Sequence, residues 1–118
     1  MTTFDHVSLV FLVRPADAPA VSDEEATALQ DAHLAHQAAL AERGLVLAAG
    51  PLVDQEDELL RGICVLSVDA ERARALYADD PAVRARRLAV QVATWMVPTG
   101  GAVFPGVRLP ASTAEALG

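Results

Sequence analysis

The chain has 118 residues, of which 53% are hydrophobic, and a formal net charge of −7. This length suits one domain, and the hydrophobic fraction is large enough to build a core and to exclude wholesale disorder. The acidic balance excludes a nucleic-acid footprint, which requires clustered cationic side chains. All nine cationic residues are arginines, and their dense cluster at residues 84–87 is typical of a solvated helix face.

The cysteine count and the hydropathy pattern indicate where the protein works. Cys64 is the only cysteine, so no intrachain disulfide can form, and its apolar surroundings in sequence predict a buried, inert thiol. No charged-then-apolar leader opens the chain, and no apolar run approaches the ~20 residues that span a bilayer. We therefore expect a cytoplasmic protein without a membrane partner.

Hydrophobic periodicity predicts four strands and two helices. The strands are expected at residues 7–13, 45–49, 60–68 and 88–97, and the helices at residues 22–43 and 69–78. Ser22 and Glu25 form a capping box at the start of the first helix, and Gly44 is a suitable residue to end it. The acidic residues 54–58 predict an exposed hairpin connection, and residues 98–118, rich in Pro and Gly, predict an irregular C-terminal tail.

The order β-α-β-β-α-β predicts the α+β fold called ferredoxin-like, which we assign to residues 1–97. Its four-stranded antiparallel sheet carries both helices on one face. The strands at residues 7–13, 45–49 and 63–68 are apolar on both sides, so the second face also needs a cover. The simplest cover is the same sheet of a second copy, which gives a homodimer, the dimeric α/β barrel. The alternative is that the tail folds back over this face through Val103, Phe104, Val107 and Leu109.

Two histidines interrupt the apolar face of the first helix. At 3.6 residues per turn, one stripe contains Ala26, Leu29, His33, His36 and Leu40. A buried polar ring without a partner costs about 1–3 kcal/mol, so each imidazole needs one. A backbone carbonyl would satisfy the ring of a purely structural histidine. Because two histidines occur at this spacing on the apolar stripe, a functional site is favoured as strongly as this structural interpretation.

Asp80 is the best candidate partner for a histidine. An aspartate before Pro81 is also a natural helix N-cap, and that role alone could account for it. Asp79 competes for the same position, and no local spacing brings either carboxylate close to the first helix. The pairing therefore depends on the tertiary fold.

Four short motifs in order resemble the YciI-like (YCII-related) family over roughly residues 5–97. They are Ala32-His33-Leu34-Ala35-His36, Gly44-Leu45-Val46-Leu47-Ala48-Ala49-Gly50-Pro51-Leu52, Ala78-Asp79-Asp80-Pro81 and Trp95. The resemblance implies a dimeric α/β barrel whose site pairs the helix histidine with the aspartate of the Asp-Pro step. These residues are His33 and Asp80 here. The chain departs from the family at His36 and Ala82, where an aromatic is usual, and the tail runs beyond the usual C-terminus.

A carboxylate bonded to one ring nitrogen fixes the tautomer and leaves the other nitrogen free to act as a base. We therefore predict His33 and Asp80 as catalytic residues for proton transfer in a lyase, isomerase or hydrolase acting on a small polar molecule. His36 would make the pocket wall more polar, and Arg14, at the end of the first strand, could hold an anionic substrate group. A surface ion pair is the alternative for Arg14.

Other site types have less support. His33, His36 and Asp80 could share a metal ion, but the usual two-histidine helix motif is spaced by four with a glutamate between. No phosphate-binding loop, nucleophile elbow or dinucleotide fingerprint occurs, so we expect neither metal nor cofactor. The rival to an enzyme is a non-catalytic module that holds a small ligand or serves only to assemble dimers, because fold alone does not decide function.

Overall fold

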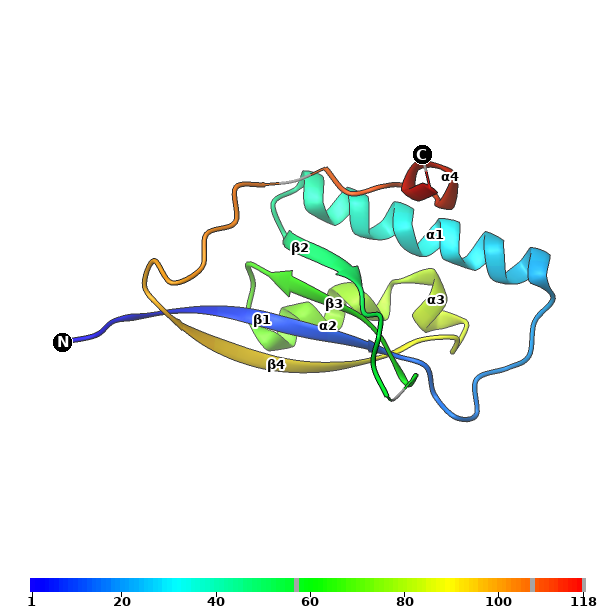
Figure 1. Cartoon of the computed structure of the whole chain (residues 1–118), viewed down its shortest axis with the longest axis horizontal. Coiled ribbons are helices and arrows are strands. Elements are labelled where there is room, and N and C mark those ends of the chain that lie inside the picture. Colours follow the sequence, from blue (N-terminus) through cyan, green and yellow to red (C-terminus); the bar gives the residue numbers. More distant parts are fainter. Residues whose placement is uncertain (57, 107, 118) are drawn as a thin grey trace.

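Strands and helices follow one another in the predicted order in the computed structural model of the chain (Figure 1). They are β1 (Phe4–Val13), α1 (Asp23–Glu42), β2 (Val46–Pro51), β3 (Leu60–Leu66), α2 (Ala70–Ala78), α3 (Pro81–Arg84), β4 (Ala89–Pro98) and α4 (Thr113–Leu117). The structure describes residues 1–56, 58–106 and 108–117. For residue 117 it describes the backbone but not the side chain. Asp57, in the predicted hairpin connection, and Val107 and Gly118, in the predicted tail, lie outside the described residues.

The four strands form one antiparallel sheet in the order β2-β3-β1-β4. The central pair therefore consists of the first and third strands, as the β-α-β-β-α-β order requires. Figure 1 shows α2 behind the strands and α1 along the β2 side of the sheet. The predicted α+β, ferredoxin-like fold is confirmed.

The start and end signals of α1 work as the sequence predicts. The Ser22 hydroxyl accepts a hydrogen bond from the backbone N–H of Glu25 at 3.1 Å. Gly44 has a φ of +74°, a left-handed conformation that glycine adopts without steric cost. None of the helices in the described ranges is both long and apolar enough to cross a bilayer.

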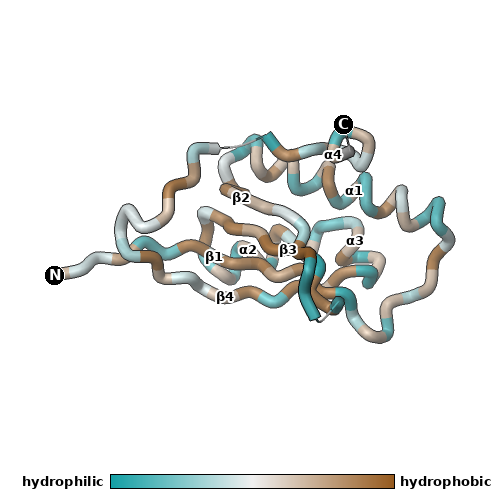
Figure 2. Tube along the Cα trace, in the orientation of Figure 1, coloured by the Kyte–Doolittle hydropathy of each residue, from teal (hydrophilic) through white to brown (hydrophobic). Residues whose placement is uncertain are grey.

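The main core lies between the sheet and the helices. Alternate residues of β1 face it, and Ser8, Val10 and Leu12 are buried. Figure 2 shows the hydrophobic colour concentrated along the strands. The Ser8 hydroxyl is satisfied inside the protein, because it donates to the carbonyl of Val68 at 2.6 Å.

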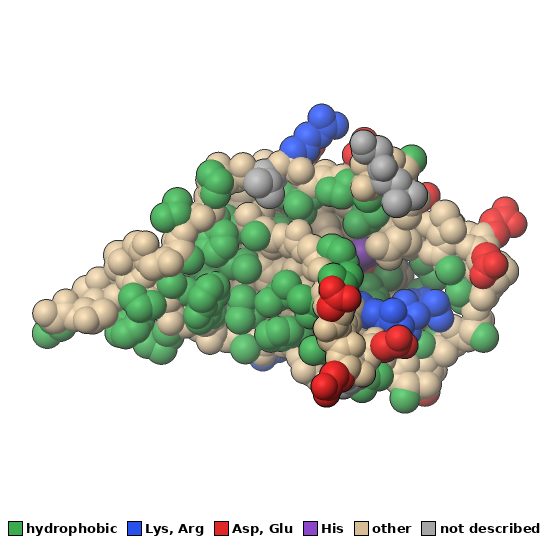
Figure 3. Space-filling view, viewed as in Figure 1, with side chains coloured by type: hydrophobic (Ala, Val, Ile, Leu, Met, Phe, Trp, Pro, Cys, Tyr) green, Lys and Arg blue, Asp and Glu red, His purple; other side chains and the backbone are tan. Residues whose placement is uncertain are grey.

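The opposite face of the sheet is also apolar. Val7 pairs with Trp95 across to β4, while Leu9 pairs with Val65 across to β3. Trp95 remains 39% exposed. Figure 3 looks at this side of the molecule and shows hydrophobic side chains gathered over the strands. The sequence predicts that this face requires a cover, and in the monomer its apolar side chains are partly exposed, in agreement with that prediction.

The tail differs from the irregular segment that its composition predicts, because its end forms α4. The Ser112 hydroxyl accepts from the N–H of Glu115 at 3.2 Å, and the Glu115 carboxylate accepts from the N–H of Ala111 at 2.7 Å. Asp31 of α1 accepts from both the backbone N–H and the hydroxyl of Thr113, each at 2.8 Å. The two bonds to Asp31 attach the end of the tail to α1, so this end does not lie across the open face of the sheet.

Candidate functional site

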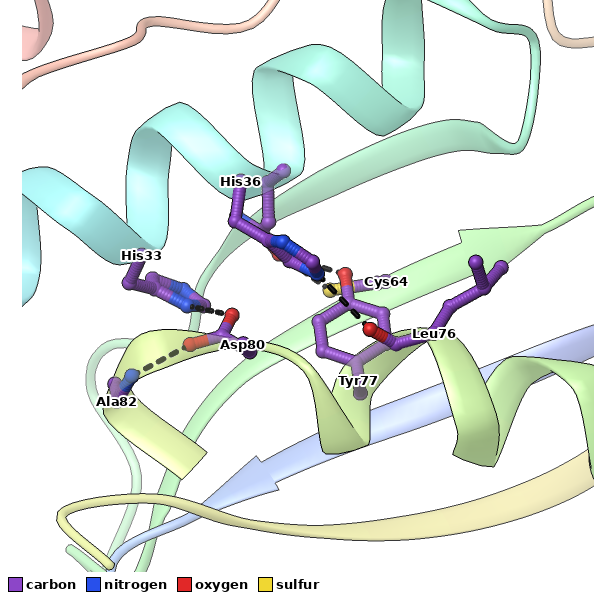
Figure 4. A network of polar contacts seen from close by, with 8 residues as sticks. His33, His36, Cys64, Leu76, Tyr77, Asp80 and Ala82 are labelled. Atoms are coloured by element: carbon purple, nitrogen blue, oxygen red, sulfur yellow. Dashed lines mark hydrogen bonds and ion pairs between the residues drawn. The ribbon is translucent and has the colours of Figure 1, made fainter. Parts of the chain in front are cut away.

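The structure brings His33 and Asp80 into direct contact, although 47 positions separate them in the chain. His33 Nδ1 lies 2.5 Å from Asp80 Oδ2. Figure 4 shows the His33 ring, on α1, directed at the Asp80 carboxylate at the start of α3. His33 is 4% exposed and Asp80 is 0% exposed. Among the described residues this is the one ion pair.

Asp80 performs both roles that its sequence position allows. Its Oδ1 accepts from the backbone N–H of Ala82 at 2.8 Å, which caps α3, while its Oδ2 bonds to the imidazole. The cap holds the carboxylate in one orientation, so the imidazole meets a fixed acceptor. Asp79 is exposed and ends α2, so it does not compete for the histidine.

The hydrogen bond to Asp80 determines what the His33 ring can do. A carboxylate only accepts, so Nδ1 carries the proton in the neutral ring and Nε2 keeps its lone pair. No residue in the described part of the chain bonds to Nε2. His33 lines the pocket described next, so the residue borders the space in which a small molecule can bind.

A cavity of about 630 Å³ adjoins His33. Its walls come from the end of β1, one face of α1, the β2–β3 hairpin and the tail. They are formed by Leu12, Arg14, Gln30, His33, Leu34, Gln37, Ala49, Gly50, Pro51, Arg61, Gly62, Leu88, Leu109, Pro110, Thr113 and Ala116. Figure 3 shows a histidine in a hollow, with cationic side chains beside it. The volume and the mainly apolar lining suit a small organic molecule.

Arg14, which the sequence predicts as a substrate-binding residue, lies in the pocket wall. Its Nε donates to the carbonyl of Arg87 at 2.8 Å, which fixes the guanidinium. Burial lowers the pKa of Arg14, and the neighbouring charges of Arg87 and Arg61 lower it further. The surface ion pair considered as an alternative does not form with any carboxylate in the described ranges.

His36 lies elsewhere. Its Nε2–H donates to the carbonyl of Leu76 at 2.9 Å, and its ring meets the edge of Tyr77 with the centroids 6.2 Å apart (Figure 4). His36 is not among the residues that line the pocket. The predicted contact with substrate does not fit this position, because a backbone carbonyl satisfies the ring as it would in a structural histidine.

The possible metal ligands do not gather at one point. The ring of His33 is directed at Asp80, while that of His36 is directed at α2. Across residues 1–56, 58–106 and 108–117, no group of three or more His, Cys, Asp or Glu side chains could hold a metal ion.

Gln37 is a pocket residue that the sequence pattern did not lead us to expect. It is 7% exposed, and its Oε1 accepts from the Tyr77 hydroxyl and from the Cys64 thiol, each at 2.9 Å. Burial raises the pKa of Cys64 to about 12, so the thiol stays protonated and unreactive at neutral pH. The signal that could have identified Gln37 is its position one helical turn after His33, on the same stripe.

Fold and site together define an α+β protein of the ferredoxin-like type, with a buried histidine–carboxylate pair at the wall of a pocket. The model of the YCII-related domain matches residues 9–96, so the chain belongs to this family. A search of curated proteins gives no match.

The fold is similar to that of a solved structure. That structure is the 5-chloro-2-hydroxyhydroquinone dehydrochlorinase (TftG) from Burkholderia phenoliruptrix AC1100, in complex with 2,5-dihydroxybenzoquinone. The two chains are 14% identical, with a TM-score of 0.59, and the match covers 81% of this chain and 99% of the other. At this identity the similarity shows the fold alone.

Proposed function

We propose that this protein is a cofactor-independent enzyme that transfers protons on a small polar molecule. His33 is its acid–base group and Asp80 orients the imidazole. The observation that carries the proposal is the buried contact of 2.5 Å between Nδ1 and the carboxylate, made by a histidine that lines the pocket. We infer that its other nitrogen, Nε2, faces the bound molecule. A general base placed in this way typically contributes a factor of about 10²–10⁴ to the rate.

The pair supports a defined sequence of proton movements. Nε2 takes a proton from a carbon or oxygen of the substrate, and the resulting imidazolium is stabilised by the Asp80 carboxylate. Returning the proton elsewhere completes an isomerisation. Departure of a leaving group with its bonding electrons completes an elimination, and a water activated by Nε2 would give hydrolysis. The fold neighbour is a dehydrochlorinase by name, which favours elimination among the three.

We also propose that the protein works as a cytoplasmic homodimer. The apolar side of the sheet, with Leu9, Phe11, Val65 and Trp95, supports this assembly, because a second copy would cover it with the same surface. Phe11→Asp would place a charge in the middle of this face and should give a monomer in sedimentation velocity. Glu71→Gln, an exposed change on α2, is the control. A wild-type monomer at all concentrations would contradict the dimer.

Proton exchange in D2O tests the catalytic proposal on a panel of compounds rather than on one chosen substrate. Small polar metabolites and 2,5-dihydroxybenzoquinone are incubated with the protein, and deuterium incorporation is followed by NMR. The wild type should accelerate exchange of at least one compound, and His33→Ala should remove the acceleration. His6→Ala is the matched control, because His6 is exposed on β1, away from the pocket.

Two results would contradict the enzyme. Exchange that is equally fast with His33→Ala would remove the histidine from the mechanism. Binding of a compound without exchange or turnover in any assay would favour the non-catalytic ligand-binding module.

A further inference from the structure

Two arginines face the same pocket as His33 without acidic partners. Arg14 and Arg61 both line the cavity, and neither forms an ion pair with a carboxylate in the described part of the chain. No arginine in the described ranges forms an ion pair with a carboxylate, so what distinguishes Arg14 and Arg61 is that both lie in the wall of the cavity beside His33.

The electrostatics of the free protein are unfavourable at this point. The guanidinium of Arg14 is partly buried, close to the like charges of Arg87 and Arg61. Among the hydrogen bonds of the described residues, the Arg14 side chain uses only its Nε, in the bond to the Arg87 carbonyl, so the terminal nitrogens remain as donors. A bound anion would relieve the repulsion and accept from the planar donor fork, which matches oxyanions in geometry.

The rest of the cavity sets the other half of the ligand. Apart from the two arginines, His33, Gln30, Gln37 and Thr113, the cavity is lined by apolar residues and glycines, among them Leu12, Leu34, Leu88, Leu109 and Pro110. Such walls favour a hydrocarbon body over a bare, strongly hydrated ion.

We propose that Arg14 and Arg61 form an anion subsite, and that the ligand of this pocket is a small organic anion with one oxyanionic group on an apolar body. The proposal deepens the proposed function, on which it rests for the statement that the ligand is a substrate. Proton removal from a molecule that is already negative is costly, and the two guanidinium groups would offset the added charge.

Binding of simple probes tests the subsite independently of catalysis. Benzoate, benzamide and inorganic phosphate are titrated separately into the isotope-labelled protein and followed by NMR. Benzoate and benzamide share size and shape but differ in charge, while phosphate has charge without an apolar body. Benzoate should bind about tenfold more tightly than either of the others, as expected for charge-assisted hydrogen bonds.

Variants assign the preference to the two arginines. Arg61→Gln and Arg14→Gln should each reduce the preference for benzoate over benzamide to about threefold or less, within the range of one such bond. Arg74→Gln, which makes the same charge change on an exposed part of α2, should leave it unchanged. Arg61 is exposed, so its variant keeps the test valid even if Arg14→Gln, which loses the bond to Arg87, does not fold.

Three binding results would each overturn the proposal: equal affinities for benzoate and benzamide, no saturable binding of benzoate, or phosphate binding as tight as that of benzoate. The proposal would also be overturned if Arg61→Gln and Arg74→Gln reduced the preference for benzoate equally. These outcomes leave the catalytic proposal standing if His33-dependent exchange is seen. Loss of exchange dependence on His33 with benzoate selectivity intact would instead refute the proposed function and leave the subsite.

Discussion

Replacing Asp80 with asparagine changes one atom of the carboxylate and should disable the proposed base. In the wild type, Oδ1 accepts from Ala82 N–H and Oδ2 accepts from the His33 ring. Asparagine has one oxygen, and the backbone N–H of Ala82 requires an acceptor because it is buried. The amide oxygen should therefore keep the cap, since asparagine is a good N-cap, and the NH₂ group should face the histidine.

The consequence for His33 follows from this orientation. An NH₂ donor facing Nδ1 selects the neutral tautomer with the proton on Nε2, and the lone pair toward the pocket is lost. We expect proton exchange or turnover to fall by a factor of about 10²–10⁴, which is the usual contribution of a general base. Stability should fall by only about 1–2 kcal/mol, because a charge-assisted hydrogen bond is exchanged for a neutral one while the cap remains.

The assay combines initial rates of deuterium exchange with urea unfolding, so that loss of activity is separated from loss of fold. Asp79→Asn is the matched control, since it makes the same change at the adjacent, exposed residue and should alter stability by less than about 0.5 kcal/mol. An Asp80→Asn protein that is folded and exchanges within about threefold of the wild-type rate would refute the reasoning, because it would fall far short of the loss expected for a general base.

Two further predictions concern the surroundings of the site. The hydrogen bonds from Thr113 lower the pKa of Asp31, so the attachment of α4 should be present above the ordinary aspartate range and be lost as the pH falls through the lowered value. Hydrogen exchange of the Thr113 amide should therefore show less protection at low pH, and Asp31→Asn should remove this pH dependence; unchanged protection across the titration would contradict the attachment. Gln37→Leu should destabilise the protein by about 2–4 kcal/mol in urea unfolding because it strands two buried donors, the Tyr77 hydroxyl and the Cys64 thiol, whereas Tyr77→Phe should cost about 1 kcal/mol. Equal costs for the two variants would show that the shared acceptor has no special importance.

Much of the fold can be predicted from local sequence signals. The Ser22 cap and the glycine at residue 44 place the ends of α1, and alternating apolar residues place the strands. The element order then leaves one common arrangement for an antiparallel sheet. These signals suffice because each depends on neighbours within a few residues.

The site is less accessible to such reasoning. The helical period shows that His33 and His36 share a face, but not that one meets Asp80 while the other meets the Leu76 carbonyl. That difference comes from where α2 ends and α3 begins relative to α1, which is a property of tertiary packing. Arg61 and α4 could not be predicted for the same reason, because their roles depend on the wall that the tail and the hairpin build together.

The central claim is that the His33 ring presents an unprotonated Nε2 to the pocket because Asp80 holds the proton on Nδ1. Two-bond ¹H–¹⁵N NMR of the wild type, recorded above the range in which imidazole usually titrates, reads the tautomer of each histidine directly. We expect the Nδ1–H form for His33 and the Nε2–H form for His36, which donates to Leu76. A His33 ring in the Nε2–H form would contradict the claim.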